Sequence, residues 1–149
     1  MRLRNLAAAA LLAAAATATG VGAGTASADS DCPTEYACMY SDAGYEGFKR
    51  VDFYSQKSWR NVTYDGTGIP LYRGDGVPTN VSSMQNRDTA KYVAVYYNSN
   101  QTGPCFSIAS FAGVYDFSWI GLSNGLAAND NMNSYLFTYK SCGTVYTDW

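Results

Sequence analysis

At positions 40 to 47 the sequence reads Tyr40-Ser41-Asp42-Ala43-Gly44-Tyr45-Glu46-Gly47. An aromatic residue is followed by four residues, a second aromatic residue, one residue and a glycine, and strand-like segments flank the stretch on both sides. Glycine takes a positive φ without a steric penalty, so Gly44 and Gly47 allow the chain to reverse. One ring then folds back over the turn while the other packs into a sheet. The stretch predicts a folded β-hairpin.

The rest of the chain after position 28 indicates an all-β domain. No long window has apolar residues at helical spacing, whereas short aromatic and β-branched runs recur between clusters of Gly, Asn, Asp and Ser. The predicted strands are residues 37–40, 48–54, 81–85, 91–97, 105–109, 134–139 and 144–147. Short helical turns are predicted at residues 58–59 and 118–120.

The hairpin pattern occurs twice. From Tyr96 to Gly103 the same spacing returns, with Gln101 in place of the second aromatic residue. Each hairpin is followed by a strand, a loop that contains Trp, and a polar turn that leads into a strand at Ser83 or Ser134. The halves are roughly residues 29–88 and 89–149. Two similar four-strand halves that bury their apolar faces against each other predict a two-sheet sandwich with Greek-key connections.

The first 28 residues are typical of a secretory signal peptide. A basic start with Arg2 and Arg4 precedes an Ala-rich apolar run, and small residues end at Ala28, after which cleavage is predicted. Residues 29–149 then suffice for one exported domain. The chain has 10 basic and 12 acidic residues, and cleavage removes two of the basic ones. An acidic surface gives no electrostatic reason to bind nucleic acid or anionic lipid, so neither partner is expected.

All four cysteines follow the predicted cleavage site, and an even number in an oxidising compartment predicts disulfides. Three pairings are possible. The short separation of Cys32 and Cys38 favours their pairing, which leaves Cys105 with Cys142. A zinc site is the alternative, but the chain has neither a Cys-x-x-Cys pair nor a histidine.

The absence of histidine also bears on catalysis. The chain has no histidine, so it has neither the base of a Ser-His or Cys-His nucleophile system nor the usual ligands of a catalytic zinc site. A glycosidase needs two carboxyl groups in one cleft. The chain has two glutamates, Glu35 and Glu46, and its aspartates lie mostly in polar turns, where capping is their usual role. We therefore expect a non-enzyme, with an undetected carboxylate pair as the remaining enzymatic alternative.

The first hairpin and the segment that leads into it, Cys32-Pro33-Thr34-Glu35-Tyr36-Ala37-Cys38-Met39-Tyr40, resemble the mature start of the Streptomyces metalloproteinase inhibitor family, which has the βγ-crystallin fold. The resemblance implies a secreted inhibitor that places a rigid loop in a protease cleft. In that family a short-range second disulfide pins the inhibitory loop. Cys105 and Cys142 are far apart, so no reactive bond is assigned. The exposed-loop candidates are residues 66–78 and 121–129.

A second resemblance concerns calcium. The segment from Asn129 to Ser134 is similar to the βγ-crystallin calcium motif, with Asn133 at the position of a hydroxyl residue. The resemblance implies a site made by the side chains of Asp130 and Asn133, the carbonyl of Asn131, and Glu46 from the opposite hairpin. The matching first-half segment, residues 78–83 with Thr102 opposite, keeps both serines but has Pro78 and Thr79 where acids or amides belong. A turn held without metal is the alternative for both segments.

These observations leave two main hypotheses. The first is an inhibitor of an extracellular protease, expected to be monomeric. The second is an extracellular module that binds one calcium ion, or that presents its tyrosines, 13 in the chain, to cell-wall sugars.

Overall fold

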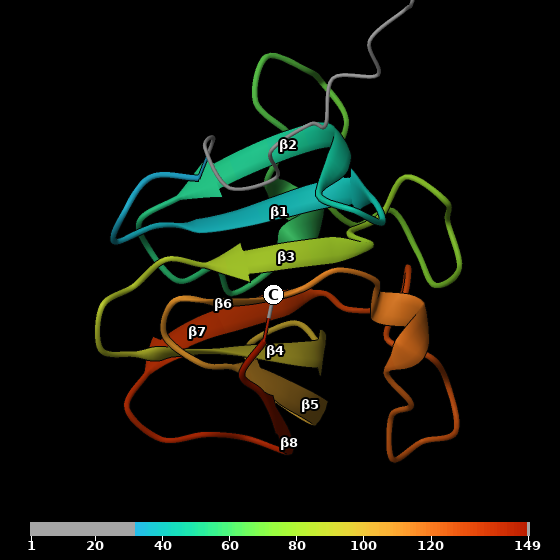
Figure 1. Cartoon of the computed structure of the whole chain (residues 1–149). Helices are drawn as coiled ribbons and strands as arrows, with labels where there is room; N and C mark the ends of the chain where they lie inside the picture. Colours follow the sequence, from blue (N-terminus) through green and yellow to red (C-terminus); the bar gives the residue numbers. More distant parts are fainter. Residues whose placement is uncertain (1–31, 149) are drawn as a thin grey trace, which may run out of the picture.

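The computed structural model describes residues 32–148, which form two β-sheets packed face to face (Figure 1). The predicted signal peptide lies outside the described residues. The elements in chain order are β1 (Ala37–Asp42), β2 (Glu46–Asp52), the 3-10 turn η1 (Trp59–Asn61), β3 (Ser83–Asn86), β4 (Tyr92–Asn98), β5 (Thr102–Ile108), β6 (Ala112–Val114), the 3-10 turn η2 (Phe117–Trp119), β7 (Ser134–Thr138) and β8 (Thr144–Tyr146). The predicted all-β sandwich is confirmed.

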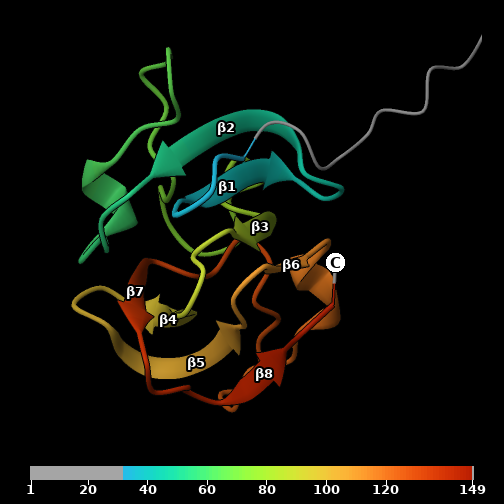
Figure 2. The same ribbon diagram turned by 60° about the vertical axis from the view of Figure 1, so that its left-hand side comes forward.

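The two sheets have the strand orders β2-β1-β3-β6 and β7-β4-β5-β8. Strand β6 follows the second hairpin in sequence but pairs with β3 of the first half, with Val114 opposite Met84. In return, Gln56 of the first half forms an isolated bridge with Tyr135 of β7. Figure 2 shows β6 beside β3, and β8 beside β5. Each half thus contributes a segment that pairs with the sheet of the other half. The sequence predicted that the halves bury their apolar faces against each other, but not this exchange of segments.

The first hairpin is held by a serine from β3. Ser83 donates its hydroxyl hydrogen to the carbonyl of Asp42 (2.6 Å) and accepts from the amide of Tyr45 (3.1 Å). Gly47 has φ +78°, and a Cβ there would lie 2.6 Å from an Asp42 carboxylate oxygen. Both the backbone angle and the close approach therefore require glycine.

The second hairpin repeats this arrangement. Ser134 donates to the carbonyl of Asn98 (2.6 Å) and accepts from the amide of Gln101 (3.1 Å). Gly103 has φ +81°, and a Cβ there would lie 2.6 Å from the amide nitrogen of the Asn98 side chain. The aromatic-to-glycine spacing thus builds the same turn twice, each closed by a serine of a neighbouring strand.

The main core lies between the sheets, and both 3-10 turns deliver an aromatic ring to it. Trp59 of η1 is fully buried, with its ring centroid 6.2 Å from that of Tyr135. In η2 the buried ring is Phe117, which meets Phe106 edge-on at 5.1 Å. Trp119 of η2 is 72% exposed. The two Trp-containing loops of the sequence therefore place their tryptophans in opposite environments.

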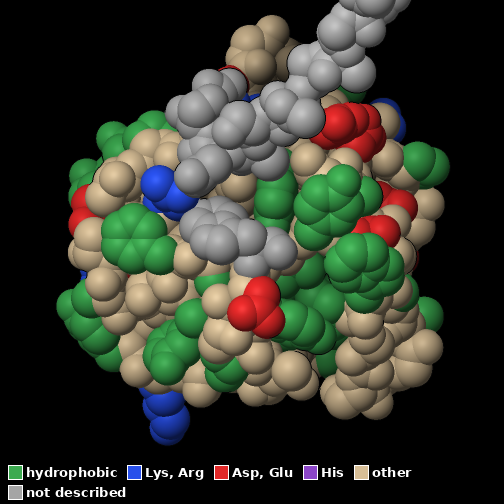
Figure 3. All heavy atoms as spheres, viewed as in Figure 1, with side chains coloured by type: hydrophobic (Ala, Val, Ile, Leu, Met, Phe, Trp, Pro, Cys, Tyr) green, Lys and Arg blue, Asp and Glu red, His purple; other side chains and the backbone are tan. Residues whose placement is uncertain are grey.

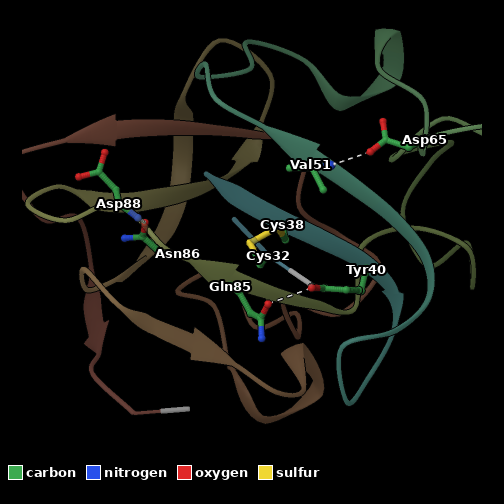
Figure 4. The surroundings of a disulfide bond; sticks show 8 residues. All are labelled: Cys32, Cys38, Tyr40, Val51, Asp65, Gln85, Asn86 and Asp88. Atoms are coloured by element: carbon green, nitrogen blue, oxygen red, sulfur yellow. Dashed lines mark hydrogen bonds between the residues drawn. A yellow bond between two sulfur atoms is a disulfide. The ribbon is translucent and has the colours of Figure 1, made fainter. Parts of the chain in front are cut away.

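The two disulfides join Cys32 to Cys38 and Cys105 to Cys142. The first belongs to a small buried cluster with Tyr40, separate from the main core. Figure 4 shows it beside Tyr40, whose hydroxyl donates to Gln85 (2.9 Å). The second ties the segment before β8 to β5.

Candidate functional site

The second part of the predicted loop 66–78 is fixed by the side chain of Asn80, a buried residue just beyond that range. We call residues 72–80 the clamped loop. The side-chain oxygen of Asn80 accepts from the amide of Arg73 (2.8 Å), and its side-chain nitrogen donates to the carbonyls of Gly74 (2.6 Å) and Asp130 (2.7 Å). Asn80 is fully buried, and these three bonds supply the partners that its buried side-chain amide needs. The clamped loop is thereby tied to itself and to the turn at Asp130.

A carboxylate and two tyrosines support the same loop. Asp75 accepts hydrogen bonds from the hydroxyls of Tyr72, within the loop, and Tyr97 of β4 (2.6 Å for Tyr97). The hydrogen bond from Tyr72, followed by that from Tyr97, lowers the pKa of Asp75. Burial, reinforced by the bond to Asp75, raises the pKa of Tyr72 to about 12. The buried Tyr64 donates to the carbonyl of Thr79 (3.1 Å) at the loop's far end. Both halves of the chain therefore hold this loop.

The second loop candidate, residues 121–129, is a small hairpin that we call the projecting loop. Gly121 and Ala127 form an isolated bridge, and the amide of Leu122 donates to the carbonyl of Leu126 (2.8 Å). Leu126 is 41% exposed at the tip. Figure 1 shows this loop and the clamped loop, coloured orange and yellow-green, extending from the same side of the molecule.

The predicted calcium ligands make different contacts in the structure. Asn133 contacts the second hairpin: its amide donates to the carbonyl of Tyr96 (2.9 Å), and its carbonyl accepts from the amide of Trp59 (2.7 Å). The Asn131 side chain donates to the carbonyls of Ala127 (3.0 Å) and Asn129 (2.8 Å), which is a turn-stabilising role.

Asp130 instead meets oxygen-bearing groups of the first half. Its carboxylate accepts from the hydroxyl of Ser82 (3.4 Å) and from the side-chain amide of Asn129 (2.8 Å). Burial raises the pKa of Asp130, and the negative charge of Asp42 in the first hairpin raises it further. Glu46 is exposed at the start of β2, beyond the same hairpin. Ser82 was not among the predicted ligands, although it is the hydroxyl residue of the first-half segment.

No group of three or more Cys, Asp or Glu side chains that is arranged to hold a metal occurs within residues 32–148. Two groups lie near the Asp130 carboxylate: the hydroxyl of Ser82, which donates to it, and the exposed carboxylate of Asp42, whose charge acts on it. Hydroxyl, carboxylate and carbonyl oxygens are the ligands calcium takes. The side-chain oxygen of Asn133 is buried and has no hydrogen-bond partner among residues 32–148, so calcium binding by this set of residues stays a prediction.

The comparison with protein families identifies the family. A model described as Peptidase inhibitor family I36 matches residues 25–108, more than half of the chain. The chain belongs to this family. The resemblance to the Streptomyces metalloproteinase inhibitors, stated from the first hairpin and its cysteines, is thus confirmed. The matched residues include the clamped loop but end before the projecting loop begins.

The comparison with solved structures supports the fold. A structure described as "Evolution of the eye lens beta-gamma-crystallin domain fold" superposes with a TM-score of 0.54 at 16% identity, over 72% of this chain and 89% of the other. At this identity the likeness shows the βγ-crystallin fold alone. No curated protein matches the sequence at a significant level.

Family membership bears on two further predictions. An inhibitor family with a crystallin fold supports the prediction of a non-enzyme. Together with two disulfides, it is also typical of an extracellular protein. Within the described residues, no helix is long and apolar enough to span a bilayer.

Proposed function

We propose that this member of the inhibitor family blocks an extracellular metalloprotease by inserting the clamped loop into its cleft. The bonds of buried Asn80 carry the proposal, because they fix the loop before it meets a partner. A loop that is already ordered loses little conformational freedom on binding, which favours tight association. The metalloprotease class is supported by the resemblance of the first hairpin and its cysteines.

The clamp would also hold the loop in place after a cut. If a protease cut the clamped loop, the Asn80 side chain would still bind Arg73 and Gly74, while Gly76 would still donate to the carbonyl of Asp130 (3.1 Å). Hydrogen bonds and neighbouring strands would hold the cut ends in place, where a disulfide holds them in the family. The clamped loop lies within the residues matched by the family model, and the projecting loop lies outside them. This difference favours the clamped loop as the inhibitory loop.

The test is an inhibition assay with matched loop variants. Purified wild-type protein is titrated against a panel of secreted metallo- and serine proteases. We expect stoichiometric inhibition of a metalloprotease, a loss of about tenfold or more in affinity for Val77→Asp in the clamped loop, and no change for Leu126→Asp in the projecting loop. The reverse pattern would assign the inhibitory role to the projecting loop. A flat response across the panel would remove the inhibitor function altogether.

Calcium binding is a second candidate, favoured by the convergence of Asp130 with Ser82 and the neighbouring charge of Asp42. A cation there would relieve the repulsion between the two carboxylates. We expect calcium to raise the melting temperature of wild-type protein relative to chelator, and Asp130→Asn to abolish that rise. Glu46→Gln and Asn133→Ala test the carried-over ligands. An equal melting temperature with calcium and with chelator would dismiss the site.

A further inference from the structure

A cavity of about 250 Å³ opens between β6, η2 and the C-terminal strand, far in sequence from the clamped loop and next to the start of the projecting loop. Its walls come from two segments that a backbone hydrogen bond joins, from the amide of Gly113 in β6 to the carbonyl of Asp148 (2.9 Å). Ile120 and Tyr146 contribute apolar lining. All lining residues come after position 108, so the cavity lies outside the family match.

One wall is an aromatic platform. The rings of Tyr115 and Trp119 are stacked, with centroids 6.0 Å apart and planes 19° apart, and Trp119 is 72% exposed. Tyr45 meets Tyr115 edge-on at 5.6 Å, and the amide of Gly44 donates to the Tyr115 carbonyl (2.8 Å). The first hairpin therefore holds this platform in place. Hydrophobic side chains gather near η2 on the face shown in Figure 3.

The C-terminal strand contributes one negative charge to the cavity lining. Asp148 lines the cavity together with Val145 and Thr147, and the lining residues include no lysine or arginine. The face of a tryptophan or tyrosine ring is electron-rich and attracts a cation, and a carboxylate nearby adds to that attraction. Anionic ligands are repelled by the same groups.

We propose that this cavity binds an organic cation, an alkylammonium or guanidinium group, through the ring of Trp119 and the carboxylate of Asp148. Two sources can present this group: a free quaternary amine, or a Lys or Arg side chain on a protein partner. A cavity lined by both an exposed tryptophan and an aspartate matches a ligand that has an apolar surface and a positive charge. The site is separate from the clamped loop, so it does not depend on the inhibitor function.

The test is an NMR titration of the full mature protein with matched ligands. The probes are choline, its uncharged isostere 3,3-dimethylbutan-1-ol, and arginine amide, at constant ionic strength. We expect choline and arginine amide to shift the amides of Val145 and Thr147 and the indole N–H of Trp119, and the uncharged alcohol to bind at least about fivefold more weakly. The tighter of the two cations identifies the source.

Variants locate the binding. Trp119→Ala and Asp148→Asn are each expected to weaken choline binding about fivefold, whereas Tyr54→Ala, which removes a 75% exposed ring elsewhere, leaves it unchanged. Trp119 is mostly exposed, so its variant is expected to keep the wild-type spectrum away from the cavity. Equal binding of choline and the alcohol would overturn the proposal, as would equal binding by wild type and Trp119→Ala. Shifts with neutral oligosaccharides but with neither cation would also overturn it and assign the cavity to sugars.

Discussion

The two hairpins have the same backbone and differ in what covers the turn. In the first, the ring of Tyr45 packs between Tyr40 and Tyr115, with centroids 5.7 and 5.6 Å away. In the second, Gln101 occupies that place, and its side-chain nitrogen donates to the carbonyl of Tyr135 (3.3 Å). The serine and the glycine therefore determine the turn. The residue two before the glycine, Tyr45 or Gln101, determines what the turn contacts, and we call it the corner residue.

The halves also differ in how they are cross-linked. The first half has a bridge between residues 6 apart, which stabilises its own small cluster. The second half has a bridge between residues 37 apart, which holds β8 against β5. The hydroxyl of Ser107 reinforces it by donating to the carbonyl of Cys142 (2.8 Å) and accepting from its amide (2.7 Å). The first half is thus stabilised locally and the second over a long span.

Removal of the disulfides should give the largest difference between the halves. On the loop-entropy model, replacing Cys105 and Cys142 by alanine lowers the free energy of unfolding by roughly 4 kcal/mol, and replacing Cys32 and Cys38 lowers it by about 2.4 kcal/mol. Denaturant unfolding of the two double variants measures both. Equal losses, or a larger loss from the short bridge, would contradict the entropic ranking and indicate that packing around Tyr40 matters more.

The second largest expected difference is in the loss of unfolding free energy when each corner residue is replaced by alanine. Tyr45→Ala removes a ring that lies on Gly113, where a Cβ would be 3.1 Å from the ring carbon bearing the hydroxyl, and we expect a loss of about 2–3 kcal/mol. Gln101→Ala removes one hydrogen bond and should lose about 1 kcal/mol. Tyr45→Phe is the control: the hydroxyl is buried with no hydrogen-bond partner among residues 32–148, so its removal should not destabilise. Equal losses at Tyr45 and Gln101 would show that the corner contacts are interchangeable.

The sequence predicted the parts of this fold that depend on local spacing. The hairpins, most strands and the two short turns near Trp59 and Trp119 follow from glycine positions and runs of aromatic and β-branched residues. Strand β6 was not predicted, because the three residues Ala112–Val114 show no alternation and pair only through tertiary contact. The exchange of segments between the halves depends on that pairing and was missed with it.

The candidate site was predicted less completely, because its contacts cross the halves. The predicted range 66–78 includes Leu71 and Tyr72, which are buried in the main core, so only part of it is exposed. The clamp by Asn80 and the bond between Asp75 and Tyr97 join residues that no local pattern relates. Asn133 was grouped with Asp130 through the resemblance to the calcium motif, which does not indicate that the Asn133 backbone bonds to Tyr96 and Trp59.

The two serines test the similarity of the hairpins. Ser83→Ala and Ser134→Ala each leave one backbone carbonyl and one amide without their partner, since each hydroxyl makes both bonds. We expect equal losses of about 1–2 kcal/mol in unfolding free energy. A loss at only one position, in the same denaturant experiment, would show that the two turns are alike in geometry but not in strength.

The smallest expected effects concern pH, at two carboxylates that lie on contacts between the halves. The folded-state pKa of Asp75 is lowered by its tyrosine partners, so its stabilising contribution is present above the unfolded pKa of about 3.9 and is lost as pH falls through the folded value. The folded-state pKa of Asp130 is raised by burial and by Asp42, so its destabilising effect grows as pH rises from the unfolded value through the folded one.

Melting temperatures measured against pH without calcium test both carboxylates. Asp75→Asn should reduce the acid sensitivity of the protein. Asp130→Asn should stabilise it at neutral pH and have no effect in strong acid. An Asp130→Asn variant that melts below wild type at neutral pH would mean that the carboxylate's bonds to Ser82 and Asn129 outweigh its desolvation, which would remove the physical basis for a cation at this turn.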